Sequence, residues 1–213
     1  MQNQLEIVYA RLLKAYGPQH WWPADDPFEV MVGAVLTQNT AWLNVEKAIN
    51  SLKQSIDISA EAILALADDE LAALIRPSGY FNIKTRRLKN LSQWFLDAGG
   101  FTELLGQDTG DLRETLLSIN GIGPETADDI LLYAFERPVF VIDLYTRRLF
   151  SRLGLVSGDE DYETLRHLFE TAMPANVSIY NEYHALIVRH AKETCSKMGD
   201  CRHCWVESAG AEF

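Results

Sequence analysis

The chain has few cysteines and no long apolar run, and these absences exclude several classes of protein. Its 213 residues contain three cysteines, all within the last nineteen, so we do not expect a disulfide framework. No apolar run approaches the roughly 20 residues that a membrane span needs. Residues 1–6 show neither the basic nor the apolar part of a secretory signal. We therefore expect a cytoplasmic chain with no membrane partner.

Basic residues are also scarce, but they gather in two windows. The chain has 19 Lys and Arg against 30 Asp and Glu, and a net charge of −11 by itself disfavours nucleic-acid binding. However, residues 76–90 hold five basic residues and no acidic one, and residues 137–152 hold four arginines and one acid. A local basic face on an acidic chain can still follow phosphates. The alternative is two solvated helix faces.

Strand signals are weak, whereas helical periodicity runs through most of the chain. Apolar residues recur on one face between Leu5 and Tyr16, as in an amphipathic helix. The best strand candidate, residues 138–142, is short. Residues predicted to cap or directly precede helices are Asp26, Thr40, Ser59, Asp68 and Asp143. We predict an all-α fold, with any domain boundary in loops near residues 23–27 and 136–139.

A glycine hairpin between two apolar helices is the most informative feature. The helices are predicted over residues 111–119 and 124–135; Gly121 and Gly123 flank the turn, and Pro124 opens the second helix. Two glycines allow a tight turn and a close approach of backbone to ligand. The unpaired N–H groups of the turn and of the following helix suit a phosphate. An ordinary turn between helices is the alternative.

Asp143 follows the hairpin as a lone carboxylate in an apolar and basic stretch. Considered alone, an aspartate at this place is most simply the N-cap of the next helix. Beside a phosphate-binding turn, it instead indicates chemistry on nucleic acid. It can serve both purposes, because a helix N-terminus favours the ionised form.

These residues resemble the endonuclease III superfamily of DNA glycosylases, in which a helix-hairpin-helix precedes a Gly/Pro-rich loop and an aspartate. The family places that aspartate twenty residues beyond the second glycine, as Gly123 and Asp143 stand here. The resemblance covers roughly residues 20–205. It implies two helical domains with a DNA-binding cleft between them. One is a six-helix barrel over residues 27–136, which contains the helix-hairpin-helix at about 111–135; the other joins residues 1–26 to 137–213, including the cysteine-containing tail.

The resemblance also implies which residues contact double-stranded DNA around a damaged base. Gln38 matches the residue that fills the hole left by a flipped base, and Tyr80 matches the wedge against the opposite strand. An ordinary polar cap and a tyrosine packed on its turn are the alternatives. The remaining residues expected to bind DNA are Lys84, Gly121, Gly123, Pro124 and Arg147. Related hairpins bind a monovalent cation through backbone carbonyls, which here are those of Leu117, Ile119 and Ile122. We expect the protein to act as a monomer.

Position 125 separates two kinds of chemistry in this family. Members that also cut the strand carry a lysine there, which forms a Schiff base with the sugar. This chain has Glu125, and a carboxylate cannot form an imine. The resemblance therefore implies a monofunctional glycosylase that uses water, with Asp143 stabilising the sugar cation and delivering that water. For Glu125 itself, a surface position at a helix N-terminus and a place in the base pocket both stay open.

The aromatic residues resemble those of the 3-methyladenine DNA glycosylase III branch of the family. There, a Trp-Pro pair and a second aromatic residue sandwich an alkylated purine, and the matching positions are Trp22, Pro23 and Trp42. Electron-rich indoles favour a cationic ring over a neutral one. A hydrophobic core is the alternative for the tryptophans. The branch also has a lysine on a C-terminal helix, where this chain has Leu186 beside His184.

The cysteine tail departs from the family pattern. Iron–sulfur members use four cysteines, whereas this chain offers Cys195, Cys201 and Cys204. A [4Fe–4S] cluster normally takes four thiolates, so we expect an absent or incomplete cluster. Free thiols, a labile three-cysteine cluster and a zinc site that includes His190 are the alternatives. The proposed hydrolysis requires no cofactor.

Two other functions compete with the glycosylase interpretation. One is a non-catalytic or differently specific helix-hairpin-helix protein that binds distorted DNA, which the missing lysine and cysteine favour. The other is a helical protein–protein adaptor, for which DNA binding would be absent or independent of salt.

Overall fold

The computed structural model of this chain describes residues 2–22, 24 and 26–195 and is built of helices joined by short loops. Across these described residues no β-strand forms, which confirms the all-α prediction. None of the helices in the described part is long and apolar enough to span a bilayer.

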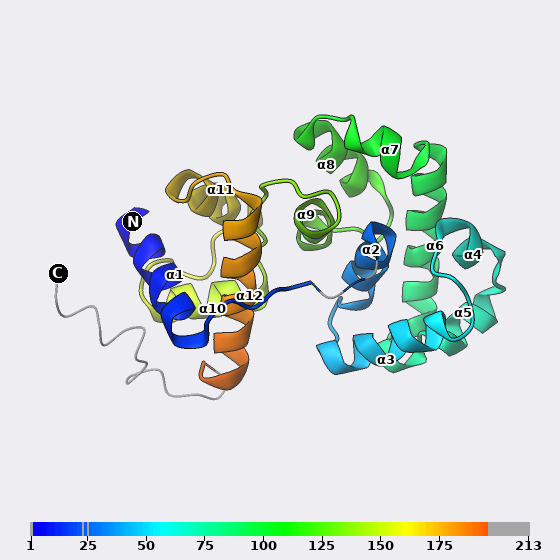
Figure 1. Cartoon of the computed structure of the whole chain (residues 1–213), viewed down its shortest axis with the longest axis horizontal. Helices are drawn as coiled ribbons and strands as arrows, with labels where there is room; N and C mark the ends of the chain where they lie inside the picture. The colour runs from blue at the N-terminus through cyan, green and yellow to red at the C-terminus, as the bar shows by residue number, and fades with distance from the viewer. Residues whose placement is uncertain (1, 23, 25, 196–213) are drawn as a thin grey trace. The chain divides into compact units, whose positions relative to one another are not determined.

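The chain divides into two compact units, residues 24–137 and residues 1–23 with 138–213 (Figure 1). The first unit contains α2 Pro27–Leu36, α3 Trp42–Lys53, α4 Ala60–Ala65, α5 Asp68–Leu74, the short 3-10 helix η1 Arg76–Ser78, α6 Phe81–Asp97, α7 Gly100–Leu105, α8 Thr109–Ser118 and α9 Pro124–Tyr133. The second contains α1 Gln2–Tyr16, α10 Leu144–Arg152, α11 Tyr162–Ala172 and α12 Val177–Glu193. The six-helix barrel and the cleft stay predictions.

Helix α2 is the centre of the first unit, because nine of its ten residues are buried. It packs against α3, α6 and α9. Its start is the predicted one: the Asp26 carboxylate accepts from the N–H groups of Phe28 and Glu29, with proline at N1. Glu29 lies in the core but is not an uncompensated charge, since the Lys53 ammonium lies 2.8 Å from its carboxylate.

A buried ion pair joins the two helices of the hairpin. The Arg113 guanidinium of α8 donates to both carboxylate oxygens of Asp128 on α9, at 2.6 and 3.1 Å. Asp128 is fully buried, and the side chain of Arg113 is 13% exposed. The paired, two-point geometry fixes how α8 and α9 are rotated against each other, and therefore the shape of the turn between them.

Aromatic rings form the core of the second unit. Phe140 stacks on Phe169, Phe150 meets Phe169 edge to face, and Tyr183 of α12 packs beside all three. The buried hydroxyl of Tyr183 donates to the carbonyl of Leu5 at 2.8 Å. This bond ties α12 to α1 and gives the phenol the partner that a buried hydroxyl needs.

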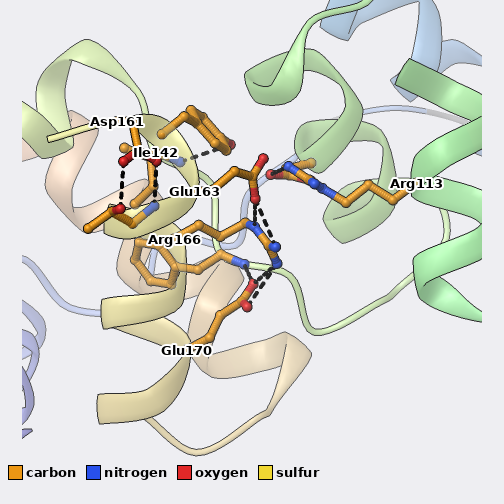
Figure 2. A network of polar contacts seen from close by, with 10 residues as sticks. Arg113, Ile142, Asp161, Glu163, Arg166 and Glu170 are labelled. Atoms are coloured by element: carbon orange, nitrogen blue, oxygen red, sulfur yellow. Dashed lines mark hydrogen bonds and ion pairs between the residues drawn. The ribbon is translucent and has the colours of Figure 1, made fainter. Parts of the chain in front are cut away.

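Residues 138–142 show why the strand signal was misleading. The segment has no regular secondary structure, and side chains of α11 take the place of a β-partner. The N–H of Phe140 donates to the Glu170 carboxylate at 3.0 Å, and the N–H of Ile142 donates to the Tyr162 hydroxyl at 3.3 Å. Figure 2 shows Arg166 in contact with the carboxylates of Glu163 and Glu170, so the acceptor for Phe140 is itself fixed. Buried Val and Phe residues produced the signal, but tertiary packing decides the conformation.

Two residues predicted to precede helices as caps, Thr40 and Asp68, are not N-caps, and one helix was not predicted. Ala41, not Thr40, is the N-cap of α3, because Thr40 Oγ1 donates to the carbonyl of Ser78 instead. Helix α5 starts at Asp68 with Ala67 as N-cap, where the Glu70 carboxylate accepts from the Ala67 N–H. The short α7, which begins at Gly100 with Gly99 as its N-cap, was not predicted at all. Ser59 and Asp143 are N-caps as predicted.

We expect Arg113→Ala to destabilise the protein by about 3–5 kcal/mol, because it leaves the Asp128 charge buried without its two-point partner. Urea unfolding at neutral pH measures the loss. Gln93→Ala is the matched control, since it removes only an exposed contact to Asp97 on α6 and should change stability by less than about 0.5 kcal/mol. Equal effects of the two substitutions would contradict the role given to the buried pair.

Candidate functional site

Asp143 is a buried N-cap carboxylate. It precedes α10 in extended backbone conformation, and its Oδ1 accepts from the N–H of Thr146 at 2.7 Å. The residue is 9% exposed, and the chain before it is the segment that α11 holds in place. One oxygen is thus occupied by the helix end, which leaves Oδ2 for other contacts.

The surroundings of Asp143 keep it ionised. Burial alone raises the pKa of Asp143, because a low-dielectric environment disfavours charge. The neighbouring His184 imidazole and the Thr146 N–H favour the carboxylate and outweigh burial, so the pKa of Asp143 is below its usual value. The start of α10 adds the favourable end of a helix dipole. The group is therefore a carboxylate near neutral pH.

His184 of α12 lies beside Asp143 but was not among the site residues predicted from the sequence. Its Nε2 lies 3.5 Å from Asp143 Oδ2, a distance longer than an ordinary hydrogen bond, and the contact is an ion pair when the imidazole is protonated. The imidazole is buried and stacks on the Trp21 indole with 5.7 Å between ring centroids. Trp21 in turn stacks on Trp22 with 5.8 Å between ring centroids. Two tryptophans, a histidine and the carboxylate thus form a continuous series within one unit. The only signal for His184 was its position beside Leu186, where the family places a lysine.

The predicted base-pocket residues are distributed over both units. Trp22 is half-buried in the stack just described, whereas Trp42 is the first residue of α3 in the other unit. The indole N–H of Trp42 donates to the Glu46 carboxylate at 2.8 Å, one helical turn away. Pro23 lies outside the described residues. Assembly of these side chains into one pocket stays a prediction.

The hairpin needs glycine at position 121 for two reasons. Its φ is +101°, in the left-handed region, and a Cβ there would lie 2.3 Å from Cγ of Arg87. At the other end of the turn, Gly123 is the N-cap of α9 without any side-chain cap, and Pro124 occupies N1. Glu125 is exposed in the first turn of α9. The uncapped helix start matches the geometry that an anion site requires.

Gln38 is held by the hairpin and by α6. Its side-chain NH₂ donates to the carbonyl of Gly121 at 3.1 Å and to Thr126 Oγ1 at 2.9 Å. Its oxygen accepts from the Arg87 guanidinium, whose stem covers Gly121. The residue predicted to fill the hole in DNA is thus connected to the turn predicted to bind phosphate. Its insertion into DNA stays a prediction and requires exchange of these bonds.

The Tyr80 side chain is exposed to solvent. The residue is the N-cap of α6 in left-handed conformation, with φ +47°, and is 67% exposed. A non-glycine residue in this region carries strain and is worth a functional explanation. The predicted alternative, a tyrosine packed on its turn, does not fit this exposure; the wedge role remains untested.

Lys84 does not have the exposed position that a DNA contact needs. It is 1% exposed, and its ammonium donates to the carbonyl of Leu36 at 2.7 Å, to Thr40 Oγ1 at 2.7 Å and to the carbonyl of Ser78 at 2.9 Å. All three N–H donors are used inside the unit. Burial, with a smaller contribution from the Arg87 charge, lowers the pKa of Lys84 to about 8. Sequence reasoning could not see that two loops enclose this side chain.

The second basic window uses its arginines largely for internal bonds. Arg147 donates to the carbonyl of Glu160 at 2.6 Å, and Arg148 donates to the carbonyl of Ala191 at 3.1 Å. Arg152 lies 3.1 Å from Cys195 Sγ. The expected DNA contact of Arg147 stays a prediction, but its guanidinium also has this structural use.

The cysteine tail lies mostly outside the described residues. Cys195 is buried, while Cys201 and Cys204 lie outside the described residues. Three cysteines in the whole chain are one fewer than a four-thiolate cluster needs, so these residues do not fit the family's cluster. Among the described residues no group of three His, Cys, Asp or Glu is arranged to hold a metal ion. Of the predicted backbone cation ligands, the Ile119 carbonyl accepts from the Ile122 N–H across the turn; that site stays a prediction.

Comparison with known proteins adds independent information. A family model described as HhH-GPD superfamily base excision DNA repair protein matches residues 32–175. A Methanocaldococcus jannaschii protein, provisionally named a DNA repair glycosylase, is 48% identical, and the alignment covers 95% of each chain. Endonuclease III of Sulfolobus acidocaldarius is 30% identical over 83% of this chain and 78% of its own.

Two solved structures are also similar. The 3-methyladenine DNA glycosylase of H. pylori, bound to 1,N6-ethenoadenine, shares 33% identity with a TM-score of 0.73, covering 89% of this chain and 97% of its own. A non-covalent endonuclease III–DNA complex has a TM-score of 0.83 at 20% identity, covering 97% and 93% of the two chains. The latter likeness concerns the fold alone.

The pKa of Lys84 predicts a specific pH dependence of stability. The folded value of about 8 lies below the usual 10.5, so between these values the unfolded chain binds more protons than the folded one. Stability should therefore gain up to about 3 kcal/mol from this residue as pH rises through that window. Urea midpoints at pH 8 and pH 10 for the wild type and Lys84→Met test this, because the variant lacks the gain. Other titrating groups, such as tyrosines, are common to both proteins and cancel; parallel curves would contradict the assignment.

Proposed function

The chain belongs to the HhH-GPD superfamily of base excision DNA repair proteins and is a DNA repair glycosylase, and we propose that it releases a damaged base by hydrolysis without cutting the strand. The observation that supports this best is the ionised, buried Asp143 in a chain with glutamate at position 125. The proposed substrate is double-stranded DNA, on which the protein acts as a monomer in the cytoplasm.

Asp143 supplies what hydrolysis of an N-glycosidic bond requires. As the base leaves with the bonding electron pair, positive charge develops on the sugar, and a fixed carboxylate nearby stabilises it. The same group can take the proton from the attacking water. The Thr146 N–H binds one carboxylate oxygen and His184, on a different helix, lies 3.5 Å from the other, so the group is oriented before substrate arrives.

The side chains at position 125 and at Lys84 favour the monofunctional route. A Schiff base needs an amine that reaches the sugar, and Glu125 offers a carboxylate where lyase members of the family carry that amine. Lys84 has the lowered pKa of a nucleophilic lysine, but its nitrogen is enclosed by three acceptors. We therefore assign neither residue a covalent role.

We propose an alkylated purine, such as 3-methyladenine, as the base. An alkylated adenine is cationic and leaves without help from a general acid, which suits a site with one carboxylate. Trp22 and Trp42 are half-buried indoles whose faces attract cationic rings. The similar H. pylori structure is named as a 3-methyladenine glycosylase and holds an adenine derivative, which supports this substrate class.

Asp143→Asn should lower single-turnover base release by about 10²–10⁴-fold while duplex binding is kept, because asparagine caps a helix equally well but carries no charge. Quantification of released bases from methylated duplex DNA measures the effect. Asp161→Asn is the matched control, since Asp161 caps α11 through the same contact, to the N–H of Thr164, and is exposed. It should leave base release unchanged.

Two outcomes would overturn the proposed chemistry. An adduct with DNA trapped by borohydride would show that an amine attacks the sugar. Absence of base release by the wild type from DNA with alkylated purines, uracil or mismatched thymine would favour the non-catalytic DNA-binding alternative.

Trp22→Leu and Trp42→Leu should reduce release of a cationic methylated purine about 2–30-fold more than release of a neutral base, because a cation–π contact contributes roughly 0.5–2 kcal/mol. Single-turnover rates on duplexes with each lesion give the ratio. Trp94→Leu, at a half-buried position on α6, controls for general loss of packing. An equal loss for charged and neutral bases would exclude a cation-selective pocket.

A further inference from the structure

The exposed side of α6 carries a hollow that borders the glycine hairpin. It has a volume of about 450 Å³ and is lined by Ile83, Arg86, Arg87, Lys89, Asn90 and Asn120. The lining includes three cationic side chains and no carboxylate. All six residues belong to the unit of residues 24–137, so the hollow is complete within one compact body.

The hollow continues an exposed stripe that starts at Tyr80. Tyr80 is 67% and Ile83 41% exposed, and Arg86 and Asn90 follow as exposed residues at helical spacing. Ten residues of helix advance about 15 Å, which equals the axial rise of roughly four nucleotides at ~3.4 Å each. The stripe therefore has the length of a short piece of one nucleic-acid strand.

The hairpin end of the stripe is attached to the turn. Asn90 donates to the carbonyl of Asn120 at 3.0 Å, and the stem of Arg87 covers Gly121. Arg87 also donates to Gln38, which in turn binds the hairpin. The wall of the hollow is thus continuous with the turn whose N–H groups suit a phosphate.

The cations of the hollow differ in what they already bind. Lys89 is paired with Asp68 at 2.5 Å and donates to the carbonyl of Leu66. Arg87 is engaged by Gln38. Arg86 is exposed and forms no ion pair with any residue in the described part of the chain. Its guanidinium is therefore the one best able to bind a ligand anion.

We propose that this hollow binds a backbone phosphate of DNA through Arg86, beside the phosphate held by the hairpin. The strand is then fixed at two neighbouring points, with Ile83 against a sugar and Tyr80 at the far end of the stripe. The absence of acidic residues from the lining, the length of the stripe and its continuity with the hairpin favour a nucleic-acid strand over an isolated anion. The ligand class rests on the proposed function.

Salt-dependent binding of the full-length protein tests the proposal. Affinity for an undamaged labelled duplex is measured by fluorescence anisotropy between 50 and 200 mM salt. Loss of one phosphate contact should lower the steepness of log K against log [salt] by about 0.9, so Arg86→Ala should show that decrease. Arg86→Lys, which keeps the charge, should show a smaller decrease in the slope. Lys14→Ala removes an exposed charge of α1 in the other unit and should leave the slope unchanged.

The result separates this inference from the proposed function. The Arg86→Ala protein should lose the same factor in affinity for damaged and for undamaged duplex. When the protein saturates the DNA, it should still release base at the wild-type rate. A slope for Arg86→Ala equal to that of Lys14→Ala, with base release intact, overturns the hollow as a phosphate site. Salt-dependent binding that needs Arg86, without base release by the wild type, overturns the proposed glycosylase chemistry alone.

Discussion

A carboxylate that is buried and still ionised is the constraint from which the arrangement around Asp143 follows. Burial opposes the charge, so the protein supplies the N-terminus of α10, the Thr146 N–H and the His184 ring to stabilise it. The chain before Asp143 has no β-partner, and α11 holds it through Glu170 and Tyr162. Helices α10, α11 and α12 therefore each contribute to the position of one side chain.

Local signals predicted the features that depend on a few neighbouring residues. Asp26, Ser59 and Asp143 cap helices because an N-cap needs only its own helix end. The prediction that Thr40 caps a helix was wrong because the carbonyl of Ser78, far along the chain, accepts from its hydroxyl. Segment 138–142 gave the best, though weak, strand signal because hydrophobicity indicates burial and does not identify the partner.

The candidate site was predictable to a similar degree. The spacing from Gly123 to Asp143 identified the carboxylate and the hairpin without any structure. His184 was not found, because its relation to Asp143 arises only when α12 packs on α10. Lys84 was given an exposed role, but it lies buried in α6, since a sequence does not show which of several basic residues is enclosed.

The ammonium of Lys84 has a mechanical consequence. Its bonds to Leu36 and Thr40 span the loop that carries Gln38, and its bond to Ser78 lies two residues before Tyr80. The two loops are therefore cross-linked at one nitrogen, and the separation between Gln38 and Tyr80 is set before any partner arrives. In the proposed reaction, the Gln38 and Tyr80 side chains would contact the double helix together, at a fixed separation. Recognition would then depend on how readily the base stack opens to that spacing, and a weakened stack is the physical property that many damaged bases share.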